Sequence, residues 1–151
     1  MIETSNGADI DRLLDRVIGH PDYFAKVVLC SPFIDNNILG RIVPFAKVAH
    51  QSKCDVRIIT SLEAGERIRR ALQTTLRHKR NLLTVSPRLH AKVYLAVARR
   101  LNDTEVIVTS ANLTCAGIQS NVELGVRAKS TSSSGRRFLN QVHRFISGLA
   151  A

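Results

Sequence analysis

Apolar residues recur along the chain in two different rhythms. Spacing of three and four residues predicts amphipathic helices, whereas alternation or short continuous apolar runs predict half-buried or buried strands. The helical rhythm covers residues 9–18, 35–52, 63–79 and 136–149. The strand rhythm covers residues 26–34, 55–61, 81–86, 89–97, 105–111 and 121–128. Helices and strands alternate first, strands then dominate, and a helix closes the chain, which predicts an α/β domain with a mixed sheet.

Polar and conformationally restricted residues mark several of the expected boundaries. Asp35 or Asn36 fits the N-cap of the second helix, in which Pro44 predicts a bend or a later start. The loop 98–104 carries turn residues between two strands and predicts a hairpin. Residues 130–135 form a short polar linker that is too brief to separate two domains, so we expect one domain over residues 1–151, either complete or the catalytic part of a longer protein.

Within the segment 88–97, two polar residues interrupt the apolar alternation. His90 and Lys92 fall on one face together with Tyr94, while the other face is apolar throughout. A His two residues before a Lys is a weak signal, because the solvated face of an ordinary strand often carries such a pair. The pair gains meaning only if other polar residues converge on it.

Composition and charge narrow the class of partner. The chain has 151 residues, 22 Lys and Arg against 12 Asp and Glu, and a formal net charge of +10. This balance favours a polyanion such as nucleic acid, because the Arg fork donates two parallel hydrogen bonds to phosphate. The same charge balance would fit equally well a soluble protein with a basic surface and no polyanionic partner. The helix 63–79 concentrates the positive charge, and Arg69 and Arg70 are its candidate contacts to nucleic acid.

Several classes of protein are disfavoured by what the sequence contains. No apolar run approaches the length of a membrane span, and the polar, acidic N-terminus does not resemble a signal peptide. The three cysteines are widely spaced and form neither a CxxC motif nor a Cys/His pair at zinc spacing. We therefore expect reduced thiols, a cytoplasmic location, no membrane partner, no metal site and no cofactor.

Three further segments supply polar groups that could converge with His90 and Lys92. Strands 89–97 and 105–111 should pair as a hairpin, which brings Ser110 and Asn112 to the same edge of the sheet. Glu123 would arrive from the next strand. Together they provide a nucleophile or base, a fixed cation, hydroxyl and amide donors, and an anion that can orient the histidine. These are the parts that phosphoryl transfer without a metal requires.

The same residues resemble the signature of the phospholipase D superfamily. "HAKVYLAV" supplies its His-x-Lys pair, and "VTSANLTCAGIQSNVELGV" resembles its Gly-Ser-x-Asn segment with a later acidic residue. The resemblance is specific over residues 88–127 and weaker over most of the chain. It implies an α/β/α sandwich in which a mixed, mostly buried sheet is flanked by helices.

Two positions depart from the family pattern. Val97 stands where the family usually has an Asp, and Thr109 replaces the Gly before the serine. Tyrosyl-DNA phosphodiesterases and some nuclease members also lack that Asp, so its loss disfavours lipid hydrolysis more than phosphodiester chemistry in general.

Family members work with two signatures in one site, whereas this chain has one His-x-Lys pair. The resemblance therefore implies a homodimer whose active site lies on the twofold axis.

The resemblance also implies roles for the candidate residues. His90 would attack phosphorus, Lys92 and Asn112 would hold the phosphate oxygens, Ser110 would add a hydrogen bond, and Glu123 would fix the tautomer of His90. Arg88 would assist phosphate binding.

The expected function is that of a metal-independent nuclease acting on DNA, such as the nuclease part of a restriction enzyme whose specificity comes from another domain or subunit. A non-catalytic nucleic-acid-binding domain is the main alternative, and a phospholipid phosphodiesterase is a less favoured one.

Overall fold

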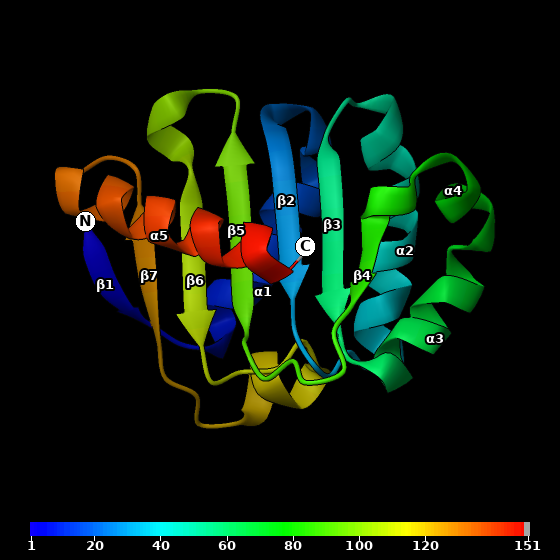
Figure 1. Ribbon diagram of the computed structural model, residues 1–151. Helices are drawn as coiled ribbons and strands as arrows, with labels where there is room; N and C mark the ends of the chain where they lie inside the picture. Colours follow the sequence, from blue (N-terminus) through cyan, green and yellow to red (C-terminus); the bar gives the residue numbers. More distant parts are fainter. Residues whose placement is uncertain (150–151) are drawn as a thin grey trace.

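One mixed sheet organises the computed structural model, which describes residues 1–149 apart from the side chains of Arg80 and Leu101. Its seven strands lie in the order β1-β7-β6-β5-β2-β3-β4 (Figure 1). The strands are β1 (Ile2–Ser5), β2 (Phe24–Cys30), β3 (Asp55–Thr60), β4 (Leu83–Val85), β5 (Val93–Ala98), β6 (Glu105–Thr109) and β7 (Gly125–Lys129). Strands β2, β3 and β4 pair in parallel, and the remaining neighbours pair antiparallel.

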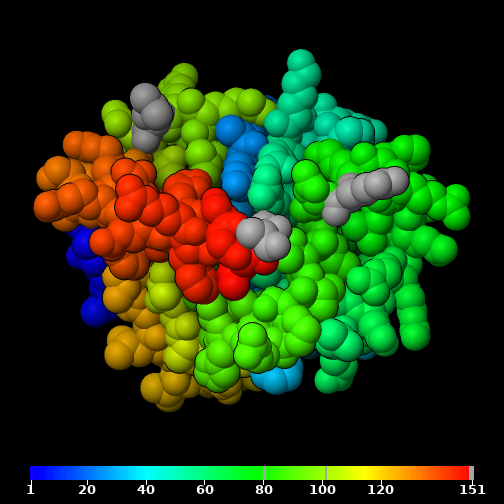
Figure 2. Space-filling view, viewed as in Figure 1, coloured from blue at the N-terminus to red at the C-terminus, as the bar shows by residue number. Residues whose placement is uncertain are grey.

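Helices cover both faces of this sheet, as the sequence predicted. In Figure 1, α1 (Gly7–Gly19) and α2 (Asn36–Gln51) lie behind the strands, and α5 (Ser133–Leu149) crosses in front of them. The space-filling view from the same side shows α5, in orange and red, across the centre of that face (Figure 2). Each face carries its own apolar core, so successive residues of β5 are buried on opposite sides: Tyr94 under the α1 and α2 layer, and Leu95 under α5. Strand β5 is therefore covered on both faces, by helices α1 and α2 on one side and by α5 on the other.

The predicted elements are present, but several of their ends differ. The segment 63–79 forms two helices, α3 (Leu62–Ala71) and α4 (Gln73–His78), which meet at the buried Leu72. Helix α2 starts at Asn36 with Asp35 as its N-cap and continues through Pro44, so a start at the proline was wrong. The 98–104 loop is a hairpin connection, as predicted. Helix α5 begins at Ser133, within the segment 130–135 that was expected to be a linker.

Two strands are shorter at the start than the alternation predicted, and this changes where the candidate residues lie. Strand β5 begins at Val93, because the ladder with β2 ends at the pair Cys30–Val93 and the ladder with β6 ends at Val93–Val108. His90 and Lys92 therefore precede the strand. Strand β7 begins at Gly125, so Glu123 also lies in a connection. Pairing with neighbours, rather than the sequence pattern, sets these ends.

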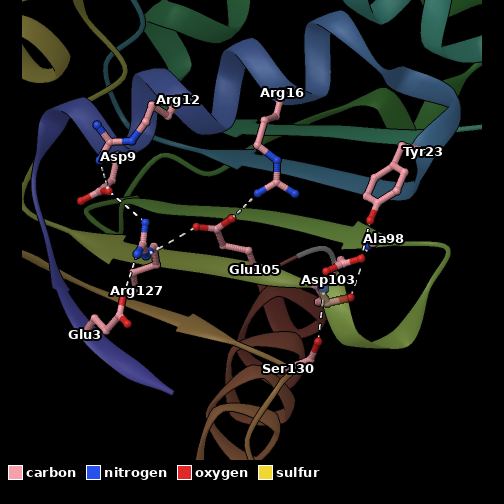
Figure 3. A network of polar contacts seen from close by, with 11 residues as sticks. Glu3, Asp9, Arg12, Arg16, Tyr23, Ala98, Asp103, Glu105, Arg127 and Ser130 are labelled. Atoms are coloured by element: carbon pink, nitrogen blue, oxygen red, sulfur yellow. Dashed lines mark hydrogen bonds and ion pairs between the residues drawn. The ribbon is translucent and has the colours of Figure 1, made fainter.

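A partly buried polar network holds the first strand, and nothing in the sequence pattern predicted it. Arg127 of β7 binds Glu3 of β1 at 2.6 Å and Asp9 of α1 at 3.1 Å, and lies 3.7 Å from Glu105 of β6 (Figure 3). Arg16 of α1 binds the same Glu105 at 2.7 Å. Burial raises the pKa of Asp9, but hydrogen bonds from the Asn6 backbone and Arg12, together with the Arg127 charge, lower it overall. The network thus joins β1, α1, β6 and β7 by charge.

Candidate active site

Four connections meet at one edge of the sheet, drawn at the bottom of Figure 1. They are the β2–α2 loop (31–35), the loop that leads into β5 (86–92), the segment after β6 (110–115) and the residues before β7 (121–124). Each candidate catalytic residue belongs to one of the last three. The antiparallel order of β5, β6 and β7 brings the start of one strand beside the end of the next, which explains the convergence.

The His-x-Lys pair lies on the loop that enters β5. His90 is exposed, Lys92 is half-buried, and the Lys92 ammonium donates to the His90 carbonyl oxygen at 3.2 Å. The backbone N–H of Thr109 donates to the Lys92 carbonyl at 3.2 Å, which ties this loop to the end of β6. Tyr94, expected on the same face, is instead fully buried, and its hydroxyl donates to the Ala111 carbonyl at 2.8 Å. It supports the site from beneath.

Ser110 and Glu123 contact each other directly. The Ser110 hydroxyl donates to the Glu123 carboxylate and accepts the Leu124 N–H at 3.2 Å. The other carboxylate oxygen accepts the Asn121 amide at 3.3 Å. Within residues 1–149, no hydrogen bond joins Glu123 to the side chain of His90. The orienting role given to Glu123 therefore stays a prediction, and its contacts within this chain fix Ser110.

Asn112 carries the most conspicuous polar atom of the site. Its Oδ1 is buried and makes no hydrogen bond to any described residue. An unmet buried polar atom costs about 1–3 kcal/mol, and this one lies at the same end of the sheet as the other candidate residues, where a ligand would satisfy it. Rotation of the amide would present Nδ2 at the same place, which is the donor that a phosphate oxygen needs.

The backbone on both sides of Asn112 is held by residues that the sequence did not identify as functional. The Leu113 N–H donates to the Ser31 hydroxyl at 3.0 Å. Asp35 accepts the Ile38 N–H at 2.8 Å with one carboxylate oxygen and the Cys115 N–H at 2.6 Å with the other. Asp35 was predicted as a helix cap, and that prediction is confirmed. Its second bond, to a residue 80 positions away, had no signal in the sequence.

Gly117 makes room for the Asn112 backbone. A Cβ atom on Gly117 would lie 2.4 Å from the Asn112 carbonyl oxygen and 3.2 Å from its nitrogen. Because that oxygen belongs to the backbone, no side-chain rotation could relieve the clash. Gly117 is the second residue of the π-helical turn Ala116–Ser120, and this turn can approach the Asn112 segment so closely only with glycine at that position.

The two departures from the family pattern have a structural context. Val97 is near the far end of β5, about 16 Å from Lys92 at about 3.3 Å per residue, and packs against the core beneath α5. An Asp at position 97 would therefore not reach the chemistry directly. The Thr109 hydroxyl donates to the Leu124 carbonyl at 3.3 Å and accepts the Ala111 N–H at 3.2 Å, so this residue braces the turn that presents Ser110.

The arginines assigned to nucleic-acid contact divide between two places. Arg88 is exposed two positions before His90, beside the site. Arg69 and Arg70 line a separate hollow at the end of α3, together with Glu66 and Gln73. Neither arginine lines the cavity that opens beside His90 under α5. Their role in binding stays a prediction.

In the part of the chain that the structure describes, no group of three or more His, Cys, Asp or Glu residues could hold a metal ion. No helix among residues 1–149 is both long and apolar enough to cross a membrane. The free thiols predicted from the sequence are confirmed: Cys30 and Cys54 are buried and unpaired, and Cys115 is half-buried and unpaired.

A family model matches most of this chain. The model describes the phospholipase D-like domain of cardiolipin synthase, and the match spans residues 25–146. The chain belongs to the phospholipase D-like family. The match includes every candidate catalytic residue, and the resemblance read from residues 88–127 is confirmed.

Solved structures agree with the phospholipase D-like fold. Nuc, a phospholipase D family member from Salmonella typhimurium, is 18% identical with a TM-score of 0.54, over 93% of this chain and 89% of Nuc. TrmBL2, an archaeal chromatin protein that binds DNA, is 14% identical with a TM-score of 0.56, over 97% of this chain. A mutant of yeast tyrosyl-DNA phosphodiesterase is 13% identical with a TM-score of 0.51, over 87% of this chain.

These alignments cover different shares of the larger proteins. The chain spans about half of TrmBL2, with 52% covered, and 47% of the yeast enzyme. Among curated proteins, none matches this sequence. At these identities the likeness establishes the fold, and the phospholipase D-like architecture predicted from the sequence is confirmed.

Proposed function

We propose that this domain is a metal-independent phosphodiesterase that cleaves the backbone of nucleic acid, with DNA as the favoured substrate. The observation that carries the proposal is the convergence of His90, Lys92, Ser110 and Asn112 at one edge of a phospholipase D-like sheet. The net charge of +10 favours a polyanionic substrate. The similarity to a tyrosyl-DNA phosphodiesterase and to a DNA-binding chromatin protein is consistent with DNA. Because the matching family model is that of cardiolipin synthase, the basic charge is what favours DNA over lipid.

The proposed reaction proceeds in two steps. A ring nitrogen of His90 attacks phosphorus, forming an N–P bond as the P–O bond to the leaving strand breaks, and His90 of a second copy donates a proton to the departing oxygen. A water molecule then gives its proton to that second histidine and attacks phosphorus, which breaks the N–P bond. Lys92 and Asn112 of both copies stabilise the negative charge on the phosphate oxygens.

A second copy is part of this proposal because the chain has one His-x-Lys pair. Support comes from the segment before β7, where two aliphatic side chains flank Glu123 and face solvent: Val122 is fully exposed and Leu124 is 70% exposed. Exposed apolar side chains next to a site are typical of a protein interface. Sedimentation should give a dimer for the wild type. Leu124→Lys should give a monomer with lost activity, while Leu62→Lys, a matched exposed position on α3, should stay dimeric.

Cleavage in excess EDTA tests the catalytic proposal. Plasmid and single-stranded DNA would be incubated with the wild type, with His90→Ala, and with His78→Ala as the control for an exposed histidine elsewhere. Cleavage by the wild type and the control, but not by His90→Ala, supports the proposal. The two histidines must differ in protonation, so we expect a bell-shaped pH profile or an acidic optimum, and a rate that keeps rising to high pH would contradict it.

Other outcomes of this assay identify the alternatives. Tight DNA binding without cleavage by any variant would indicate a non-catalytic binding domain, which the similarity to TrmBL2 favours as the second candidate. Cleavage of phospholipid but not of DNA would indicate a lipid phosphodiesterase. If the enzyme cuts DNA only together with another domain or subunit, the role of a restriction nuclease gains support.

A further inference from the structure

A cavity of about 540 Å³ opens beside the candidate active site, between α5 and the sheet. Its floor is formed by Val93 and Val108, at the ends of β5 and β6 nearest the site. Its mouth is formed by His90, Lys92 and Ser110. The volume lies in the range of small-ligand sites, which is about 300–1,000 Å³. The proposed chemistry therefore takes place at the rim of a largely apolar hollow.

One face of α5 forms the opposite wall. Phe138, Gln141, Val142 and Phe145 line the cavity, and their spacing of three, four and seven residues places them on one side of the helix. Phe145 is 46% exposed, although two other phenylalanines of the chain are buried. Gln141 is also exposed, and its amide offers one acceptor and a pair of donors at the edge of the apolar wall.

The two sides of the cavity together indicate the chemistry of its ligand. The Lys92 ammonium suits a phosphate, the two phenyl rings suit a flat aromatic group, and the Gln141 amide suits the polar edge of that group. A nucleotide carries all three features within one covalent unit. We propose that the cavity binds the base of a nucleotide adjacent to the phosphate that is cleaved. This inference rests on the proposed function and specifies its substrate.

An unpaired base is required for such binding. In a duplex the base is stacked and paired, and taking it out costs a few kcal/mol. The preferred substrate is therefore single-stranded or locally unpaired nucleic acid. An acyl chain would also fill an apolar hollow, but it would leave the Gln141 amide to water, whereas a base can hydrogen-bond with it. The amide and the basic charge of the chain together favour a base.

The test compares two oligomers with the same phosphate backbone, a thymidine 20-mer and a 20-mer in which every nucleotide is abasic. Cleavage rates and anisotropy binding constants would be measured for the wild type, Phe145→Ala and Gln141→Ala. Leu62→Ala is the control for an exposed apolar residue away from the cavity. Binding measured in the His90→Ala background reports on the cavity even if no strand is cut.

The wild type should bind and cleave the thymidine oligomer about tenfold better than the abasic one, which corresponds to one stacked base. Phe145→Ala should reduce that advantage several-fold and leave the abasic oligomer unaffected. Equal handling of both oligomers by the wild type would overturn the inference, as would a Phe145→Ala loss that is the same for both.

The remaining outcomes separate the inference from the proposed function. Base-dependent binding without cleavage would support the base site while contradicting the catalytic proposal. Phosphatidylglycerol vesicles that bind the wild type through Phe145, without any preference for the thymidine oligomer, would overturn the base site in favour of a lipid. A Phe145→Ala protein that becomes monomeric would overturn it in favour of an interface between two copies.

Discussion

Replacing Asp35 by Asn tests whether the backbone around Asn112 is held as the site requires. The carboxylate accepts two backbone N–H groups at once, from Ile38 at 2.8 Å and from Cys115 at 2.6 Å. An amide has one acceptor atom, so one of these donors loses its partner. Asn caps a helix about as well as Asp, so we expect the Ile38 bond to persist and the Cys115 bond to be lost.

The size of the effect follows from that geometry. A hydrogen bond to a charged acceptor contributes about 1.5–3 kcal/mol, so the free energy of unfolding should fall by about 2 kcal/mol. For a domain of this length that corresponds to a Tm lower by about 4–8 °C. Because the freed segment carries Asn112, kcat should fall about tenfold with little change in KM, as a loss of about 1.4 kcal/mol at the transition state implies.

The assay combines chemical denaturation with kinetics on a labelled oligonucleotide, at a temperature where the variant is fully folded. Asp15→Asn is the control, because its carboxylate is 72% exposed, pairs with Arg41 on the surface, and should matter little. A variant that loses stability as calculated but keeps the wild-type kcat would refute the positioning argument. An unchanged free energy of unfolding would refute the hydrogen bonds themselves.

Four further outcomes are expected. Gly117→Ala should lower both kcat and the free energy of unfolding, because its methyl group displaces the Asn112 backbone; kinetics at a temperature where circular dichroism shows the variant to be folded separate the two effects. Arg127→Met should lower the free energy of unfolding by about 2–4 kcal/mol, because it leaves buried carboxylates without that partner. The pKa of Asp9 is lowered in the fold, so its contribution to stability is present above its ordinary pKa of 3.8 and disappears as the pH falls through the lower folded pKa. Acid titrations of the stability of the wild type and of Arg127→Met should converge at that pH, and parallel curves would contradict this. Burial raises the pKa of Cys30 to about 11, so at pH 8 an alkylating reagent should label Cys115 first and leave Cys30 unmodified until the protein unfolds, whereas rapid labelling of Cys30 would contradict its burial.

The sequence predicted the centre of the fold better than its edges. The apolar runs of β2, β3, β5 and β6 identify strands because both faces of those strands are buried. Strand β1 has the sequence "IETS" and lies at the sheet edge with Ile2 and Thr4 exposed and only Ser5 buried, so it has no apolar signal. Its pairing with β7 and the Arg127 network help to hold it there.

The sequence predicted which residues form the candidate site, but not the contacts that position them. The alternation around His90 indicated a strand, whereas the residue lies on a loop whose end is set by pairing with β2 and β6. The contacts that support Asn112 come from Ser31 and Asp35, about 80 residues earlier. The cavity wall comes from α5, which the sequence predicted only as an amphipathic helix. Such long-range contacts depend on the packed fold and leave no local pattern.

Detection of a covalent intermediate tests the central claim most directly. The wild type would be mixed with an oligonucleotide in excess EDTA, stopped within the first turnover by alkaline denaturant, and digested with trypsin. Cleavage after Arg88 and Lys92 releases the peptide 89–92, which contains His90. This peptide should carry the mass of the retained oligonucleotide fragment, joined through its terminal phosphate, and the adduct should be absent in His90→Ala. Strand cleavage without an adduct on this peptide, or cleavage that persists in His90→Ala, would contradict it.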